Sequence, residues 1–276
     1  AYEQEFAEFM GGGYADLVNS GTSALYTALG ALELEVAGEV IAPVISDHGG
    51  VMPAALLNQV PVLADTQPGS YNIGPEQIEA LLSPHTRAIV VAHISGEPVD
   101  MDPVLELAHQ RNIPVIEDCA QAHGATYKGR MVGTMGTIGI FSTMSGKHHA
   151  TGPQGGVVFT RDEALYWQAK RFADRGKPFN TDSESCLRAG LNLNGNDLAA
   201  AIGRVQLRKL GTIVERRLDF FGPGTAGGAQ ADLIDVTDVV HFGSTADGAR
   251  EALPHAVYMV APIQMRVHVN EGHRLR

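Results

Sequence analysis

The stretch Val115-Ile116-Glu117-Asp118-Cys119-Ala120-Gln121-Ala122-His123-Gly124 is a short apolar run that ends in two carboxylates and then turns small and polar. Such a run is typical of a buried strand. In parallel sheets, ligands bind beyond the carboxyl ends of the strands, so an acid there is predicted to face the ligand crevice. It could pair with a protonated ring nitrogen, as a pyridine coenzyme requires.

Two alternatives stay open for this stretch from the residues alone. Asp118 could simply cap the following turn, or it could bind a metal together with His123. Nothing else in the chain has metal-ligand spacing, so the sequence predicts no metal site.

Apolar runs and helix-period segments alternate from the start of the chain to about residue 160. Strands are predicted at Val40–Ile45, Val60–Ala64 and Ala88–Ala92, in addition to the one above, Pro114–Ile116. Helices are predicted at Thr22–Leu32, Pro75–Leu82, Pro103–Gln110, Asp162–Arg175 and Asn196–Phe220, with Asn196 or Asp197 as the cap of the last one. Alternation of this kind predicts an α/β fold with a mostly parallel central sheet flanked by helices.

The character of the chain changes after Phe221. Gly222–Gly228 is typical of a linker, and the remainder offers two plausible strands, Val236–Phe242 and Ala256–Val269. We therefore expect a large domain over residues 1–220 and a small, partial or reduced α+β part over residues 221–276.

Composition excludes several classes of protein. The chain of 276 residues has a formal charge of −11, which disfavours a nucleic-acid partner because phosphates would be repelled. No apolar run approaches the roughly 20 residues that cross a bilayer, so no membrane association is expected. The chain has 2 cysteines, so a disulfide framework is not indicated and a reducing cytoplasm is expected.

A second candidate site is Asn19-Ser20-Gly21-Thr22-Ser23-Ala24-Leu25, a small polar turn that runs into a helix. Free N–H groups and the helix dipole make such a helix start a phosphate site, and the Thr22 and Ser23 hydroxyls add donors. Taken alone, the same residues more often form an ordinary helix cap, and that interpretation comes first.

The third candidate is Lys147, one of five lysines in the chain. It lies between Ser142–Gly146 and Thr151–Gly156, two stretches rich in small and polar residues that are themselves between apolar strands. The other four lysines have charged or exposed neighbours. A desolvated amine there would have a lowered pKa and could form an imine. His148 and His149 follow directly and are interpreted as loop residues, because neighbouring histidines seldom share one metal.

Together these three stretches make the sequence resemble the DegT/DnrJ/EryC1/StrS family of sugar aminotransferases, which use pyridoxal 5′-phosphate (PLP) and have the type I fold of aspartate aminotransferase. The resemblance covers about residues 2 to 220. Beyond the stretches quoted, it rests on Pro61 to Asp65, Tyr71-Asn72-Ile73, His93 to Gly96, Asp100-Met101-Asp102, Phe141-Ser142, Gly155-Gly156 and Gly190-Leu191-Asn192.

The resemblance implies a role for each matching residue. Lys147 would carry PLP as a Schiff base and move protons, and Asp118 would hold the pyridinium nitrogen. Gln121 would contact the phenolic oxygen of the ring. The phosphate would be bound by Gly21, Thr22, Ser23 and Ser142. Asn192 would reach the phosphate of a neighbouring subunit, which implies a homodimer with shared active sites.

The sequence also departs from the family pattern. The family usually has an aromatic residue that stacks on the ring after the strand ending near Ile45, whereas this chain has Ser46-Asp47-His48-Gly49-Gly50. His48 is the candidate for that stacking, although the register leaves Asp47 open. Asn194 stands where the family commonly has arginine, and the part after Gly222 is much shorter than the family's C-terminal domain.

The resemblance implies transamination from glutamate or glutamine to a keto-sugar, most plausibly nucleotide-linked, or a keto-cyclitol, with pyridoxamine phosphate as the intermediate coenzyme form. Two alternatives remain. One is a sugar dehydratase using PLP or pyridoxamine phosphate, in which histidine replaces the lysine. The other is a non-catalytic or regulatory PLP-binding homologue.

Overall fold

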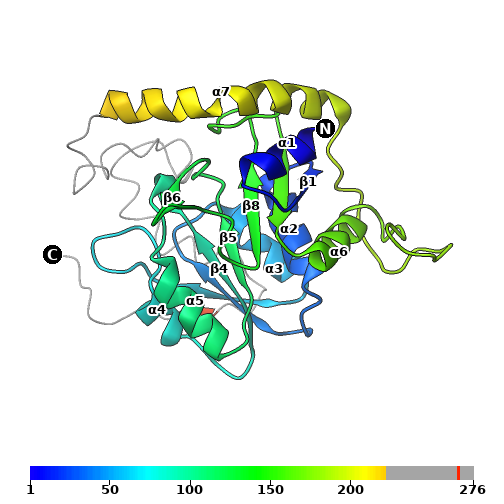
Figure 1. Ribbon diagram of the computed structural model, residues 1–276. Helices are drawn as coiled ribbons and strands as arrows, with labels where there is room; N and C mark the ends of the chain where they lie inside the picture. The colour runs from blue at the N-terminus through cyan, green and yellow to red at the C-terminus, as the bar shows by residue number, and fades with distance from the viewer. Residues whose placement is uncertain (222–265, 268–276) are drawn as a thin grey trace.

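The computed structural model describes residues 1–221 and 266–267. In that part of the chain, eight strands form one sheet with helices on both faces (Figure 1). In spatial order the strands are β1 (Tyr14–Val18), β9 (Gly156–Thr160), β8 (Ile138–Ser142), β5 (Val115–Asp118), β4 (Thr86–Ala92), β2 (Glu39–Pro43), β3 (Val60–Ala64) and β10 (Arg266–Val267). Strand β9 runs antiparallel to both of its neighbours, β1 and β8. The other neighbouring pairs, from β8–β5 through β5–β4, β4–β2 and β2–β3 to β3–β10, are parallel. The predicted α/β class with a mostly parallel sheet is confirmed.

The helices alternate with the strands along the chain. They are α1 (Tyr2–Phe9), α2 (Gly21–Ala31), α3 (Met52–Leu56), α4 (Pro75–Glu79), α5 (Met101–Gln110), α6 (Glu163–Ala173) and α7 (Asp197–Phe221). Two short 3-10 turns, η1 (His48–Gly50) and η2 (Ile94–Gly96), follow β2 and β4, and β6 (Thr126–Tyr127) pairs with β7 (Arg130–Met131) as a small hairpin. None of the described helices is long and apolar enough to pass through a bilayer.

Each face of the sheet is covered because successive side chains of a strand point to opposite sides. Val90 of β4 packs in the cluster formed with α2 and α6. Its neighbours Ile89 and Val91 pack in the cluster formed with α4 and α5. At the other end of the second face, Phe141 of β8 packs with α1 and α7, and α7 lies across the top of the molecule in Figure 1.

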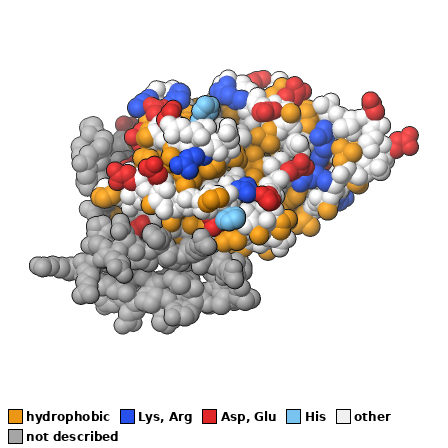
Figure 2. All heavy atoms as spheres, turned by 90° about the horizontal axis from the view of Figure 1, so that it is seen from below, with side chains coloured by type: hydrophobic (Ala, Val, Ile, Leu, Met, Phe, Trp, Pro, Cys, Tyr) orange, Lys and Arg blue, Asp and Glu red, His pale blue; other side chains and the backbone are white. Residues whose placement is uncertain are grey.

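The surface mixes charges of both signs. Figure 2 shows acidic and basic side chains interspersed over the face that it displays. Several are paired, as in the ion pair of Arg87 with Glu35 at 2.7 Å and that of Lys128 with Asp102 at 2.7 Å.

The predicted elements agree with the observed ones except at some ends. The strand predicted at Val60–Ala64 has those bounds, whereas α4 ends at Glu79, three residues short of the prediction. Helix α5 starts at Met101, before Pro103, and the first turn tolerates the proline because its N–H would lack a helical partner. Asn196 caps α7, since its Oδ1 accepts a hydrogen bond from the N–H of Ala199 at 2.9 Å.

Some of the structure was not predicted from sequence, and some predictions fall outside the described residues. Helix α1 and strand β1 have no counterpart among the predicted elements. The linker at 222–228 and the strand at 236–242 lie outside the described residues, as does most of the strand predicted at 256–269, of which only Arg266–Val267 is described as β10. The proposed division into residues 1–220 and 221–276 therefore stays a prediction.

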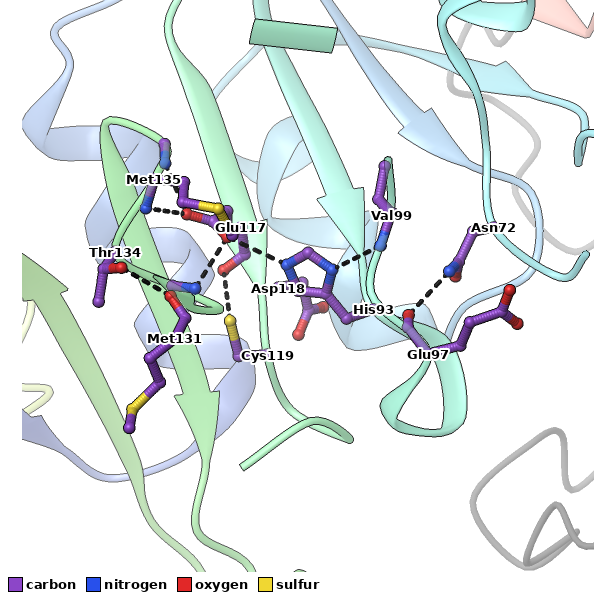
Figure 3. Close-up of polar contacts among 12 residues, drawn as sticks. Asn72, His93, Glu97, Val99, Glu117, Asp118, Cys119, Met131, Thr134 and Met135 are labelled. Carbon is purple, nitrogen blue, oxygen red and sulfur yellow. Dashed lines mark hydrogen bonds and ion pairs between the residues drawn. The ribbon is translucent and has the colours of Figure 1, made fainter. Parts of the chain in front are cut away.

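The ends of β4 and β5 are joined through a fully buried pair, His93 and Glu117 (Figure 3). His93 Nδ1 accepts a hydrogen bond from the Val99 N–H at 3.0 Å, so the ring proton is on Nε2, which donates to Glu117 Oε2 at 3.1 Å. Glu117 also accepts bonds from three backbone N–H groups, those of Gly133, Met135 and Gly136.

Four donors satisfy the carboxylate of Glu117. Burial raises the pKa of Glu117, but the bonds from His93, Gly136 and Gly133 outweigh it, and the pKa lies below its ordinary value. A carboxyl group of this kind stabilises the fold above its unfolded pKa and loses that contribution as the pH falls. Glu117 thus fixes the loop after β7 against the end of β5.

We predict that Glu117→Gln lowers the free energy of unfolding by about 2–4 kcal/mol at neutral pH, because an amide offers one acceptor oxygen and turns a donor toward backbone N–H groups. The difference in free energy of unfolding between the parent and Glu117→Gln should become smaller at acid pH, where Glu117 itself is protonated. Denaturant unfolding measures both, with Glu106→Gln on the exposed surface of α5 as the matched control. Equal stability of the two variants at neutral pH would contradict this role.

Candidate active site

Three parallel strands end along one edge of the sheet. The registers pair Ala92 with Asp118 and Asp118 with Ile140, so β4, β5 and β8 finish close together. This edge is where ligands bind in sheets of this kind. Successive side chains alternate, so Asp118 lies on the same side as Ile116, which packs in the cluster with α2, while Glu117 faces the opposite side.

The start of α2 abuts the end of β8 at this edge. A Cβ added to Gly21 would lie 2.7 Å from Ser142 Cβ, so only glycine permits this approach. A Cβ on Gly156 would lie 2.2 Å from the backbone oxygen of Ser20. The first-turn N–H groups of α2 thus lie beside the Ser142 side chain, which is an arrangement that suits an anion.

The polar turn before α2 also forms the ordinary helix cap that was the alternative interpretation. Ser20 Oγ accepts a hydrogen bond from the Ser23 N–H at 3.0 Å. The Ser23 hydroxyl donates to Asn19 Oδ1 at 2.5 Å. The cap engages Ser23 locally, so Gly21, Thr22 and Ser142 are better placed than Ser23 to meet a ligand.

Asp118 is a buried carboxyl group at the end of β5. Its Oδ1 accepts a hydrogen bond from the Ala120 N–H at 2.9 Å, so the turn-capping alternative is also realised. Burial raises the pKa of Asp118, and the hydrogen bond from the Ala120 N–H and the nearby charge of Lys147 offset only part of that effect. A cationic partner at this carboxyl group would relieve the cost of its burial.

The turn after β2 lies between Asp118 and the start of α2. Asp47 Oδ1 accepts a hydrogen bond from the Gly49 N–H at 2.7 Å and so shapes this turn. A Cβ on Gly49 would lie 2.3 Å from Thr22 Oγ1, and a Cβ on Gly50 would lie 3.5 Å from Asp118 Oδ2. His48 is exposed on the same turn.

Gln121 links the loops that follow β4 and β5. Its Oε1 accepts a hydrogen bond from the Ser95 N–H at 2.8 Å. Ser95 has a φ of 55°, in the left-handed region that non-glycine residues rarely adopt. Gln121 therefore stabilises an unusual backbone turn at the same edge as Asp118.

Lys147 lies in the loop that joins β8 to β9. The two ends of this loop are tied by the hydroxyl groups of Thr143 and Thr151, 2.7 Å apart, and a Cβ on Gly155 would collide with both. The loop begins directly after β8, whose end is in register with Asp118, and the positive charge of Lys147 lowers the pKa of that carboxyl group. The structure thus brings together the phosphate turn, the strand-end acid and the lysine that the sequence singled out.

The two histidines after Lys147 do not behave as simple loop residues. His149 is buried, and its Nε2 lies 2.6 Å from the Tyr2 hydroxyl oxygen. The ring centroid of His123 lies 6.0 Å from those of both His148 and His149. Burial, followed by the charges of His149, His148 and Lys147, keeps the pKa of His123 well below its ordinary value.

Lys170 is one of the four lysines that were expected to have charged or exposed neighbours. It forms an ion pair with Asp16, a carboxyl group that is 2% exposed, so its charged neighbour is buried. Helix α6 thus turns this lysine toward β1.

The metal alternative for Asp118 with His123 gains no third ligand among the described residues. The potential ligands that do lie within 4.8 Å of one another in residues 1–221 are His93, Glu117 and Cys119. Both ring nitrogens of His93 and both oxygens of Glu117 are engaged in the hydrogen bonds of Figure 3. This group is therefore part of the framework behind Asp118.

Asn192 is exposed beside the carboxyl end of β1. It forms an isolated antiparallel bridge with Asp174, and its Oδ1 accepts a hydrogen bond from Asn194 Nδ2 at 3.1 Å. Leu193 between them is buried in the cluster with α2 and α6. Asn194 thus contacts Asn192 directly through its amide.

Comparison with known proteins gives the site a context. The model of the DegT/DnrJ/EryC1/StrS aminotransferase family matches residues 1–223. GDP-perosamine synthase of Caulobacter vibrioides is 36% identical over 210 residues, which are 76% of this chain and 56% of that protein. The L-glutamine:2-deoxy-scyllo-inosose aminotransferase of Micromonospora echinospora is 38% identical over 177 residues, 64% of this chain and 42% of that protein.

Solved structures agree with the sequence relatives. The crystal structure of an aminotransferase from Psychrobacter cryohalolentis superposes with a TM-score of 0.73 at 38% identity, and the match covers 76% of this chain and 56% of that one. The chain spans about half the length of the curated relatives it matches. The fold is that of the type I PLP-dependent aminotransferases, and the chain belongs to the DegT/DnrJ/EryC1/StrS aminotransferase family.

Proposed function

We propose that this chain is the coenzyme-binding part of a PLP-dependent aminotransferase, with Lys147 as the residue that bonds to PLP. One observation carries the proposal. The start of α2 with Ser142, the Asp118 carboxyl group and the Lys147 loop meet at a single edge of the sheet, although they are far apart in sequence.

The residues at this edge fit PLP in chemistry as well as in place. The close approach of Gly21 to Ser142 leaves helix N–H groups and a hydroxyl beside each other, as a phosphate group requires. The raised pKa of buried Asp118 suits a carboxyl group that pairs with a protonated ring nitrogen. When bound, PLP would supply an electron sink for reactions at the carbon that bears the amino group.

The chain's own residues would do the rest of the work. Gly21, Thr22 and Ser142 would bind the phosphate, with Ser23 shaping the turn. Gln121 would contact the phenolic oxygen, and His48 would lie against the ring. Asp118 would keep the ring nitrogen protonated, and the Lys147 amine would move a proton between a substrate carbon and a coenzyme carbon as base and then as acid. Asn192 would reach the phosphate bound by a partner subunit, so we infer a homodimer.

The substrates are inferred from the relatives' names. We propose glutamate or glutamine as the amino donor, and a nucleotide-linked keto-sugar or a keto-cyclitol as the acceptor. Cys119 and Cys186 are free thiols, which supports a reducing compartment such as the cytoplasm. The dehydratase alternative needs a histidine in place of the lysine. The packing of the His148 ring near His123, with the Lys147 charge acting on Asp118, favours Lys147 in that position.

We predict that the purified chain with PLP gives a visible absorbance band that glutamate or glutamine bleaches, and that Lys147→Ala abolishes the band. Lys209→Ala, an exposed lysine of α7, should leave it unchanged. Absorption spectra before and after the donor measure this. A band that ignores every amino donor would point to a dehydratase or a non-catalytic homologue, and the absence of a Lys147-dependent band would refute the proposal.

We also predict that Asp118→Asn lowers turnover by about 10²-fold, because an amide cannot hold the ring nitrogen in its charged form. Without coenzyme, the variant should be at least as stable as the parent. The pKa of Asp118 is raised in the fold, so its ionised form at neutral pH costs stability that asparagine does not.

Turnover and thermal unfolding of the coenzyme-free chain test the Asp118→Asn prediction together. Asp182→Asn, an exposed residue of the loop after α6, is the control. An Asp118→Asn variant that turned over normally would show that this carboxyl group does not act on the coenzyme.

A further inference from the structure

Helix α1 contacts the Lys147 loop through one long-range hydrogen bond. The Tyr2 hydroxyl oxygen lies 2.6 Å from His149 Nε2, and both residues are buried, with 2% and 0% of their surfaces exposed. Burial raises the pKa of Tyr2 above its ordinary value and lowers the pKa of His149 to about 4. Both groups are therefore neutral at physiological pH and share a hydrogen bond that has no competing water.

The contact is closed from above by α7. A Cβ on Gly203 would lie 2.6 Å from Tyr2 Cε2 and 2.9 Å from Thr151 Cγ2, so glycine is required for α7 to pack this closely on both. The rings of Phe6 and His123 complete the surroundings of His149, each with its centroid 6.0 Å away. We name Tyr2, His149, Thr151 and Gly203 the loop clamp.

The loop clamp holds the part of the loop that follows Lys147. His149 is two residues after the lysine, and Thr151 is fixed to Thr143 by a backbone hydrogen bond of 2.9 Å as well as by the paired hydroxyl groups. On the other side, the Lys147 N–H donates to the Met144 oxygen at 2.9 Å and closes a turn. The backbone of Lys147 is thus held between a local turn and a contact with α1.

We propose that Tyr2 and His149 are positioning residues for Lys147, which hold its amine toward Asp118 without touching the coenzyme. The proposal rests on the function proposed above for Lys147. A lysine side chain has many rotamers. A mobile backbone would add further positions of the amine, so a fixed backbone is needed to keep the amine near Asp118. Helix α1, through Tyr2, then sets how often the amine is correctly placed for bond formation with PLP and for proton transfer.

The first test needs no coenzyme. Hydrogen–deuterium exchange of the full chain should show residues 143–152 exchanging about tenfold faster in Tyr2→Phe than in the parent, since one buried hydrogen bond is lost. Residues 115–120 of β5 should be unaffected. Tyr14→Phe is the matched control, because it loses a hydroxyl of β1 that interacts with the Glu163 side chain of α6 and not with the Lys147 loop. Equal protection of 143–152 in Tyr2→Phe and Tyr14→Phe would overturn the proposal.

The second test measures the lysine. The growth of the absorbance band measures the rate at which Lys147 bonds to added PLP. This rate should fall about tenfold in Tyr2→Phe and in His149→Phe. His149→Gln, which keeps a hydrogen-bonding group near the Tyr2 hydroxyl, should recover part of the rate. The turnover number should fall while KM for the amino donor stays constant, since the donor's own contacts are intact.

The two tests separate the clamp from the proposed function. Normal rates in a Tyr2→Phe chain whose loop exchanges faster would show that the clamp does not position the amine, and would overturn the proposal. If the parent chain forms no Lys147-dependent band at all, the proposed function fails, while the exchange experiment still decides whether Tyr2 holds the loop.

Discussion

Two adjacent carboxyl groups at the end of β5 must face opposite sides of the sheet, and the rest of the site depends on that constraint. Glu117 faces inward to His93 and three backbone N–H groups, which satisfy it completely. Asp118 faces the side of α2, and the Gly49–Gly50 turn lies between it and Thr22. One acid thus holds the framework, and its neighbour keeps a raised pKa for pairing with a cationic group.

The same division between framework and chemistry recurs around the edge of the sheet. Glycines at positions 21, 156 and 203 allow helix α2, strand β9 and helix α7 to approach neighbours at distances that a Cβ would prevent. Close packing of this kind places groups from distant segments without long side chains that would need ordering. The lysine loop is the exception, because Lys147 is long, and its backbone is held by contacts with α1 and α7.

Most strands and the three candidate stretches could be predicted from the sequence, because each depends on residues that are close together in the chain. Strand β3 has its predicted bounds because an apolar run is bounded by Asn58 and Asp65. The phosphate turn, Asp118 and Lys147 were found because small, acidic and basic residues stand out between apolar runs. The stretch Glu117-Asp118 did not reveal which acid faces the site, although strand alternation shows that only one can.

Features that depend on distant contacts escaped the sequence. The burial of His149 depends on a contact between residues 2 and 149, which no local pattern encodes. The ion pair of Lys170 with buried Asp16 was not predicted, because Asp16 lies on a strand that the pattern did not identify. His93 was noted only as part of a family match, and its bond to Glu117 became visible when β4 and β5 were paired.

The central claim is that Lys147 bonds to PLP, and chemical trapping tests it most directly. The chain would be incubated with PLP, reduced with borohydride, digested and examined by mass spectrometry. The account predicts a reduced pyridoxyl-phosphate adduct on Lys147 at about one per chain, with the exposed Lys128 and Lys209 unmodified. An adduct spread evenly over the lysines, or found mainly on another one, would contradict the account.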